Sequence, residues 1–96
     1  MLTKDALEVE VDKYNIIQAN ADYCPVTMAL SKQLGVFEDA IQVQRNSVRV
    51  FNSYDEISAV YVAEGNELES FMDSWERYML GVDNDVKPFT FKLIKK

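Results

Sequence analysis

Apolar and polar side chains that alternate along the sequence restrict most strongly how this chain can fold. Two segments, LEVEVDKYNII and KPFTFKLIKK, have this pattern. Their apolar members are Leu7, Val9 and Val11 in the first segment, and Phe89, Phe91 and either Leu93 or Ile94 in the second. Successive side chains of a strand point to opposite faces, so a period of two predicts strands that each bury one face.

The middle of the chain contains further strand patterns. AIQVQRNSVRVFNS has apolar pairs on either side of the turn RNS, which is typical of a β-hairpin. The β-branched and aromatic run from Ile57 to Val62 favours another strand. Its weak alternation also allows the alternative that it leads directly into the following helix.

Two segments have the end signals and the period of helices. Cys24 and Pro25 open the first, because proline lacks only an N–H that has no partner in a first turn, and Gly35 ends it. In the second, NELESFMDSWERYMLG, Asn66 can cap the start and Gly81 can end the helix. The second helix has an apolar stripe of Leu68, Phe71, Met72, Trp75 and Met79 beside an acidic stripe of Glu69, Asp73 and Glu76.

These segments predict a single small α+β domain over residues 1–96, with a mainly antiparallel sheet of four to five strands and two helices packed on one face. The chain has no run of about 18 apolar residues, and its first residues are charged where an export signal is apolar. We therefore expect a cytoplasmic protein without membrane contact. With one cysteine and no histidine, we expect no internal disulfide, no zinc site of the usual kind and no cofactor.

The net charge of −6 is unevenly distributed. Nine acids between Ser53 and Asp85 accompany Arg77 alone, whereas the last eleven residues contain four lysines and no acid. Because phosphate-binding surfaces need clustered Lys and Arg, the charge favours a partner protein with a basic surface over nucleic acid. The candidate partner-binding residues are Glu64, Glu67, Glu69, Asp73, Glu76, Asp83 and Asp85, with Tyr54 or Tyr61 as aromatic anchors.

Two other functions fit parts of the sequence. A protein that binds or sequesters a nucleotide would need a basic pocket, for which Arg45, Arg49, Lys87 and Lys92 are the available set. A thiol-dependent enzyme would rely on Cys24, whose thiolate a helix N-terminus can stabilise. A cysteine hydrolase usually also needs a histidine base, so the pattern favours a packing role for Cys24.

Carboxylates also suit divalent cations, but the spacing of the acidic stripe is equally that of a solvated helix face, and we expect no metal. The segment DNDV lacks the glycine and the distal glutamate of a calcium loop. The segment SVRVFNS could form a sheet edge that pairs with a second copy in a homodimer, unless Arg49 guards that edge.

Two motifs carry a family resemblance. CPVTMAL at Cys24–Leu30 and GVDNDVKPFTFKL at Gly81–Leu93 resemble the helix start and closing strand of small uncharacterised proteins common in bacteriophages and prophages. The resemblance covers about a third of the chain, and the segment from Ser53 to Ala63 departs from the pattern. It implies a phage accessory protein in a bacterial host and transfers no catalytic residue.

Charge and resemblance together give the leading hypothesis. We expect a non-catalytic phage-type protein that binds and modulates or inhibits a host or defence protein through an acidic surface. Some anti-CRISPR proteins, which occupy surfaces evolved for DNA phosphate, are similar to this description.

Overall fold

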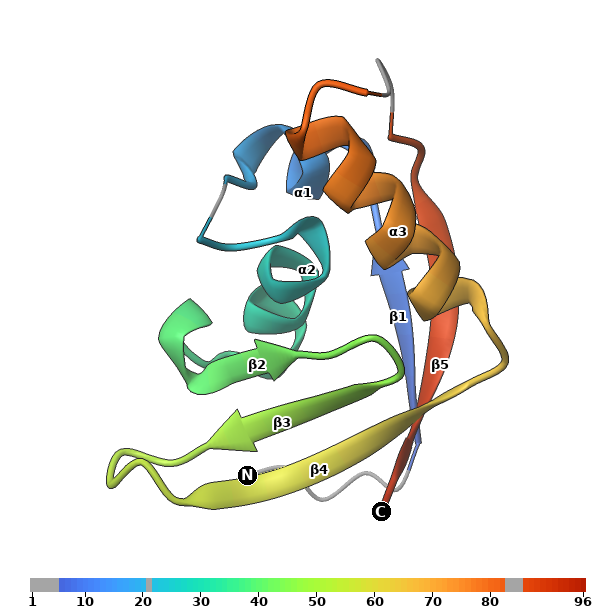
Figure 1. Cartoon of the computed structure of the whole chain (residues 1–96). Coiled ribbons are helices and arrows are strands. Elements are labelled where there is room, and N and C mark those ends of the chain that lie inside the picture. Colours follow the sequence, from blue (N-terminus) through green and yellow to red (C-terminus); the bar gives the residue numbers. More distant parts are fainter. Residues whose placement is uncertain (1–5, 21, 83–85) are drawn as a thin grey trace.

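Five strands form one antiparallel sheet in the order β1-β5-β4-β3-β2, and the helices lie on one of its faces (Figure 1). The computed structural model describes residues 6–20, 22–82 and 86–96. Its elements are β1 (Ala6–Val11), α1 (Lys13–Gln18), α2 (Pro25–Leu34), the 3-10 helix η1 (Glu38–Ala40), β2 (Ile41–Val43), β3 (Ser47–Phe51), β4 (Ile57–Glu64), α3 (Glu67–Met79) and β5 (Phe89–Lys95). The predicted α+β class is confirmed.

The sheet bends around α2. Its two edge strands, β1 and β2, both contact this helix, and Figure 1 shows β1 and β5 running steeply across the direction of β2, β3 and β4. Val26 and Leu30 of α2 are fully buried inside the bend. Apolar side chains from every strand meet them there, so α2 forms the centre of the core.

The strand register decides which side chains enter this core. Leu7 pairs with Leu93 and Val9 pairs with Phe91, and all four side chains are buried. Ile94 lies on the opposite face and is 41% exposed. Of the two residues that could continue the buried series of β5, the structure therefore selects Leu93.

The first strand is shorter than the sequence pattern predicts. It ends at Val11, and residues 13–18 form α1, where LEVEVDKYNII was expected to continue as a strand. The reason is a reciprocal capping box: the Asn15 N–H donates to Asp12 Oδ1 and the Asp12 N–H donates to Asn15 Oδ1, each at 2.9 Å. These bonds satisfy groups at the helix start and favour a turn over an extended chain.

The other predicted helices form, with different details. Pro25 begins α2, and Gly35 ends it with a φ of 69° that glycine adopts without strain. Asn66 occupies the N-cap position of α3, but its side chain makes no capping bond, so that expectation is wrong. Met79, predicted in the core stripe, is 44% exposed because α3 extends past the end of the apolar layer.

Helix α3 packs against β5 through three buried side chains, Leu68, Phe71 and Trp75. The Phe71 ring stacks on Phe89 of β5 with centroids 4.3 Å apart. None of the described helices is long and apolar enough to cross a membrane.

Strand β3 is not a sheet edge. It lies between β2 and β4 and pairs with both, so its backbone groups are already engaged. The expectation that SVRVFNS pairs with a second copy is therefore wrong, and Arg49 does not guard an edge.

The central position of α2 makes a stability prediction. Leu30→Ala should lower the free energy of unfolding by about 2–5 kcal/mol, because it opens a cavity inside the bend. Leu80→Ala is the matched control, since Leu80 is 72% exposed and its truncation should cost no more than about 0.5 kcal/mol. Urea unfolding of both variants measures the difference, and equal losses would contradict this account of the core.

Candidate functional site

Helix α3 presents carboxylates on the side next to its buried face. Intervals of four and three residues place Glu69, Asp73 and Glu76 in one line along the helix. Glu69 and Glu76 are exposed and Asp73 is half-buried. We call these three residues the α3 acidic stripe, which the structure assembles as the sequence predicts.

Arg45, in the turn between β2 and β3, contacts this stripe. Its guanidinium donates a hydrogen bond to Asp73 Oδ1, and its Nη2 lies 3.9 Å from Glu69 Oε1. The hydrogen bond to Asp73 is the main cause that raises the pKa of Arg45, and the charges of Asp73, Glu69 and Glu76 raise it further. Arg45 thus neutralises part of the stripe and connects the turn to α3. The sequence assigns Arg45 to the basic set of a nucleotide-binding pocket, and no local pattern indicates its contact with α3.

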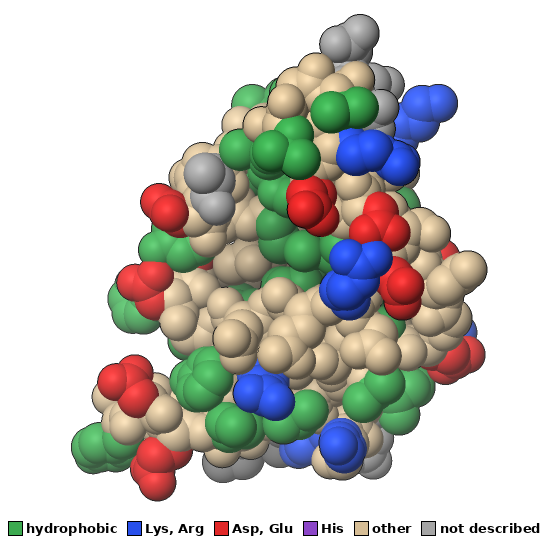
Figure 2. All heavy atoms as spheres, in the orientation of Figure 1, with side chains coloured by type: hydrophobic (Ala, Val, Ile, Leu, Met, Phe, Trp, Pro, Cys, Tyr) green, Lys and Arg blue, Asp and Glu red, His purple; other side chains and the backbone are tan. Residues whose placement is uncertain are grey.

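The C-terminal end of α3 is apolar and exposed. Tyr78, Met79, Leu80 and Val82 all leave large parts of their side chains open to solvent. Leu80 follows Glu76 by four residues and so continues the line of the stripe. Figure 2 shows acidic and basic side chains side by side over α3, with a strip of hydrophobic side chains next to them. We call Tyr78, Met79 and Leu80 the apolar end of α3.

The sequence signal for the apolar end was the run YML before Gly81. Its helical period assigned Met79 to the core, because a periodic pattern does not show where the sheet beneath the helix stops. Only the packing of α3 on β5 separates the buried turns from the exposed last turn.

The two tyrosine candidates lie elsewhere. Tyr61 is 1% exposed, on the core face of β4 opposite Val48, so its prediction as a surface anchor is wrong. Tyr54 is 81% exposed in the turn between β3 and β4, where its N–H and that of Glu56 donate to Asn52 Oδ1 at 2.8 and 3.1 Å. All eight residues of β4 separate this turn from α3, so the structure does not join Tyr54 to the stripe (Figure 1).

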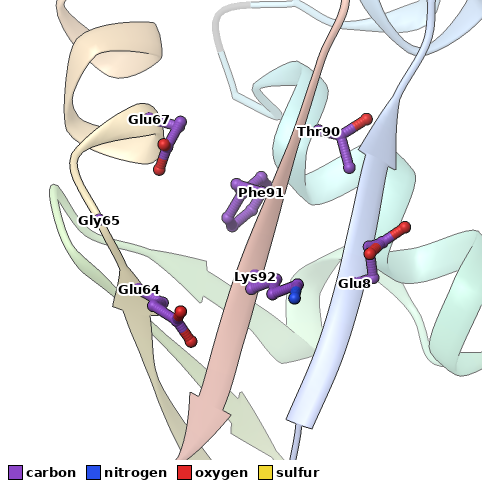
Figure 3. A pocket seen from close by; sticks show the side chains of 7 residues that line it. All are labelled: Glu8, Glu64, Gly65, Glu67, Thr90, Phe91 and Lys92. Atoms are coloured by element: carbon purple, nitrogen blue, oxygen red, sulfur yellow. The ribbon is translucent and has the colours of Figure 1, made fainter.

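Glu64 and Glu67 form part of a second acidic site. With Glu8 and Lys92 they line an open pocket of about 320 Å³ (Figure 3). Gly65 stands between them with a φ of 80°, and a Cβ there would lie 2.5 Å from Glu67 Oε2. Glycine therefore lets the Glu67 carboxylate fold back over the turn into α3. Among the described residues, no group of three or more Asp, Glu, Cys or His is placed to hold a metal ion.

Asp83 and Asp85 lie outside the described residues. Of the seven predicted acids, the structure therefore brings three together on α3 and places two at the pocket of Figure 3.

The four cations of the nucleotide hypothesis occupy different places. Arg45 is bound to the α3 acidic stripe, and Arg49 lies on the face of the sheet away from the helices. Lys92 lines one pocket together with Glu8, Glu64 and Glu67, and Lys87 lines a separate pocket of about 450 Å³ beside α3. A phosphate group would need several of these charges to converge.

Cys24 is half-buried at the start of α2 and packs against the core. Its Sγ lies 3.5 Å from Thr27 Oγ1 and makes no capping bond to the helix. These contacts favour the packing role, while the reactivity of the thiol stays a prediction.

Comparisons of this chain with protein-family models, with curated proteins and with solved structures found no match.

The contact between Arg45 and Asp73 makes a prediction about α3. In a double-mutant cycle with Arg45→Ala and Asp73→Ala, urea unfolding should give a favourable coupling at low salt. The coupling should disappear near about 1 M salt, because screening then acts over about 3 Å. Arg49→Ala combined with Asp73→Ala is the control, since Arg49 lies on the opposite face of the sheet and should show no coupling. Equal coupling in both cycles would contradict the assignment.

Proposed function

We propose that this chain is a non-catalytic binding module that holds a basic protein surface against α3. The observation that carries the proposal is the pairing, on one helix, of the α3 acidic stripe with the apolar end of α3. Carboxylates attract and orient a basic partner, whereas exposed aromatic and aliphatic side chains supply area that is dehydrated on contact. Neither half alone distinguishes a binding surface from an ordinary solvated helix.

Arg45 shapes how such a partner binds. Arg45 already forms ion pairs with Glu69 and Asp73. The negative charge of these two carboxylates is therefore partly neutralised before a cation of the partner binds. Glu76 is exposed and lies between them and the apolar end. A lysine or arginine of the partner that binds at Glu76 would place its neighbouring apolar side chains over Met79 and Leu80.

The resemblance to small phage proteins supports a host or defence protein as the partner. A phage accessory protein acts in the cytoplasm of its bacterial host, where proteins that handle nucleic acid have basic surfaces. An acidic helix that covers such a surface would compete with the phosphates of the nucleic acid. In this proposal the chain modulates or inhibits its partner as a DNA mimic does, as in some anti-CRISPR proteins.

Affinity capture from a bacterial lysate tests this function. The bait proteins are the wild-type chain and the triple variant Glu69→Lys/Asp73→Lys/Glu76→Lys, each at low and high salt with mass-spectrometric identification. We expect one dominant basic partner that the wild-type chain retains at low salt and loses at high salt. The triple variant should not capture it.

The control is Asp22→Lys/Glu38→Lys/Glu56→Lys, which changes the net charge equally at residues away from α3. It should capture the partner as the wild-type chain does, and circular dichroism should show that both variants are folded. Loss of capture in the control would show that total charge is responsible. Retention of the partner by the α3 triple variant would refute the proposed surface.

The apolar end has its own test on the same captured partner. Leu80→Ser should weaken capture while preserving its salt dependence, because it removes apolar area and leaves the carboxylates in place. Ile17→Ser is the matched control, since Ile17 is also highly exposed but belongs to α1. If the two variants behave alike, the apolar end takes no part in binding.

A further inference from the structure

The face of the sheet away from the helices has an apolar row at its centre. Ala6, Ile94 and Val62 are directly opposite one another on β1, β5 and β4, and all three are exposed. Val60 extends the row by one position along β4. Antiparallel sheets usually present polar side chains on a solvated face. The described helices lie on the other face, so none of them covers this row (Figure 1).

Charges of opposite sign flank the apolar row. On one side the next positions along the strands are Glu8, Lys92 and Glu64, with Glu10 beyond them. On the other side Arg49 lies on β3 opposite Val60, next to the neutral Gln42. Within the described part of the chain, neither Glu64 nor Arg49 has an ion-pair partner. The face thus has one flank that is acidic in sum, with Lys92 between Glu8 and Glu64, an apolar middle, and a flank that carries Arg49.

We propose that this face binds a second copy of the chain, with a two-fold axis along the apolar row and across the strands. Rotation about that axis places the row of one copy on the row of the other. It also places the acidic flank of each copy over the basic flank of its partner, which satisfies both charged flanks at once. An axis along the strands would instead place acidic flank on acidic flank. The charge pattern therefore selects one of the two arrangements.

This dimer does not involve α3. The helices lie on the far side of each sheet, so the α3 acidic stripe and the apolar end would point outwards in both copies. The dimer goes beyond the proposed function and is independent of it. Its experiment measures the mass of the chain alone and needs no partner protein. If both hold, one dimer would present two α3 surfaces to a basic partner.

Analytical ultracentrifugation of the full chain, from roughly 1 μM to 1 mM, tests the proposal. We expect the wild-type chain to pass from monomer to dimer in this range. Ile94→Glu should raise the dissociation constant at least about 10-fold, because each interface would contain two new charges near its centre. Val62→Thr keeps the shape of the side chain and should weaken the dimer less, which gives a second readout if Ile94→Glu does not fold.

Ile17→Glu is the matched control, since Ile17 is 74% exposed on α1 and should leave the dissociation constant unchanged. A wild-type chain that stays monomeric at the highest concentration would overturn the proposal. A dimer that Ile94→Glu and Val62→Thr leave intact would overturn it as well, because its interface would then lie elsewhere.

A charge exchange tests the orientation of the two-fold axis. Glu64→Arg and Arg49→Glu should each weaken the dimer, since each creates like charges across the interface. The double variant Glu64→Arg/Arg49→Glu should recover most of the lost affinity, because the flanks are again complementary. If the double variant is weaker than both single variants, the flanks do not face each other and the proposed axis is wrong.

Discussion

Burial of α2 inside the bend of the sheet is the constraint on which the rest of the structure depends. An antiparallel sheet with one apolar face needs a cover, and a single ten-residue helix provides it only if the sheet closes around it. Both edge strands therefore contact α2. Gln33 of α2 donates from Nε2 to the Glu8 carbonyl of edge strand β1 at 3.0 Å, which adds a polar link to the apolar packing. Once α2 occupies the bend, α3 packs on β5, and none of the described helices lies on the opposite face.

The rotational setting of α3 then distributes the acidic charge. Because Leu68, Phe71 and Trp75 point towards the sheet, Glu69, Asp73 and Glu76 must lie on the side that meets the β2–β3 turn. Glu67, the first residue of α3, lies apart from this stripe and lines a pocket together with Glu64. The acids between residues 64 and 76 follow one another closely in the sequence, but in the molecule they form two surfaces, the α3 acidic stripe and the pocket of Figure 3. Arg45 contacts the α3 acidic stripe through Asp73. These two residues are 28 positions apart in the sequence, so only the tertiary structure brings them together.

Much of the fold was predictable because its signals are local. The alternation in LEVEV and FTFKL, the proline and glycine around α2 and the period of α3 each act within a few residues, and all correspond to elements of the structure. The Asp12–Asn15 capping box is also a local signal, and it ends the strand inside the segment LEVEVDKYNII, whose alternation predicts a strand. The position of β3 between β2 and β4 was not predictable in this way, since strand order depends on which distant segments pair.

In the candidate site, too, local sequence signals predict some features and long-range contacts decide the others. The sequence by itself determined the acidic stripe, because helical geometry fixes the neighbours of Glu69 whatever the helix packs on. It also determined the secondary structure of most of the described residues and the α+β class. The tertiary structure decided that Tyr61 is buried, that Met79 and Ile94 are exposed and that Arg45 joins the stripe. Exposure and long-range ion pairs depend on where each element ends against its neighbours, which no periodic pattern within one element contains.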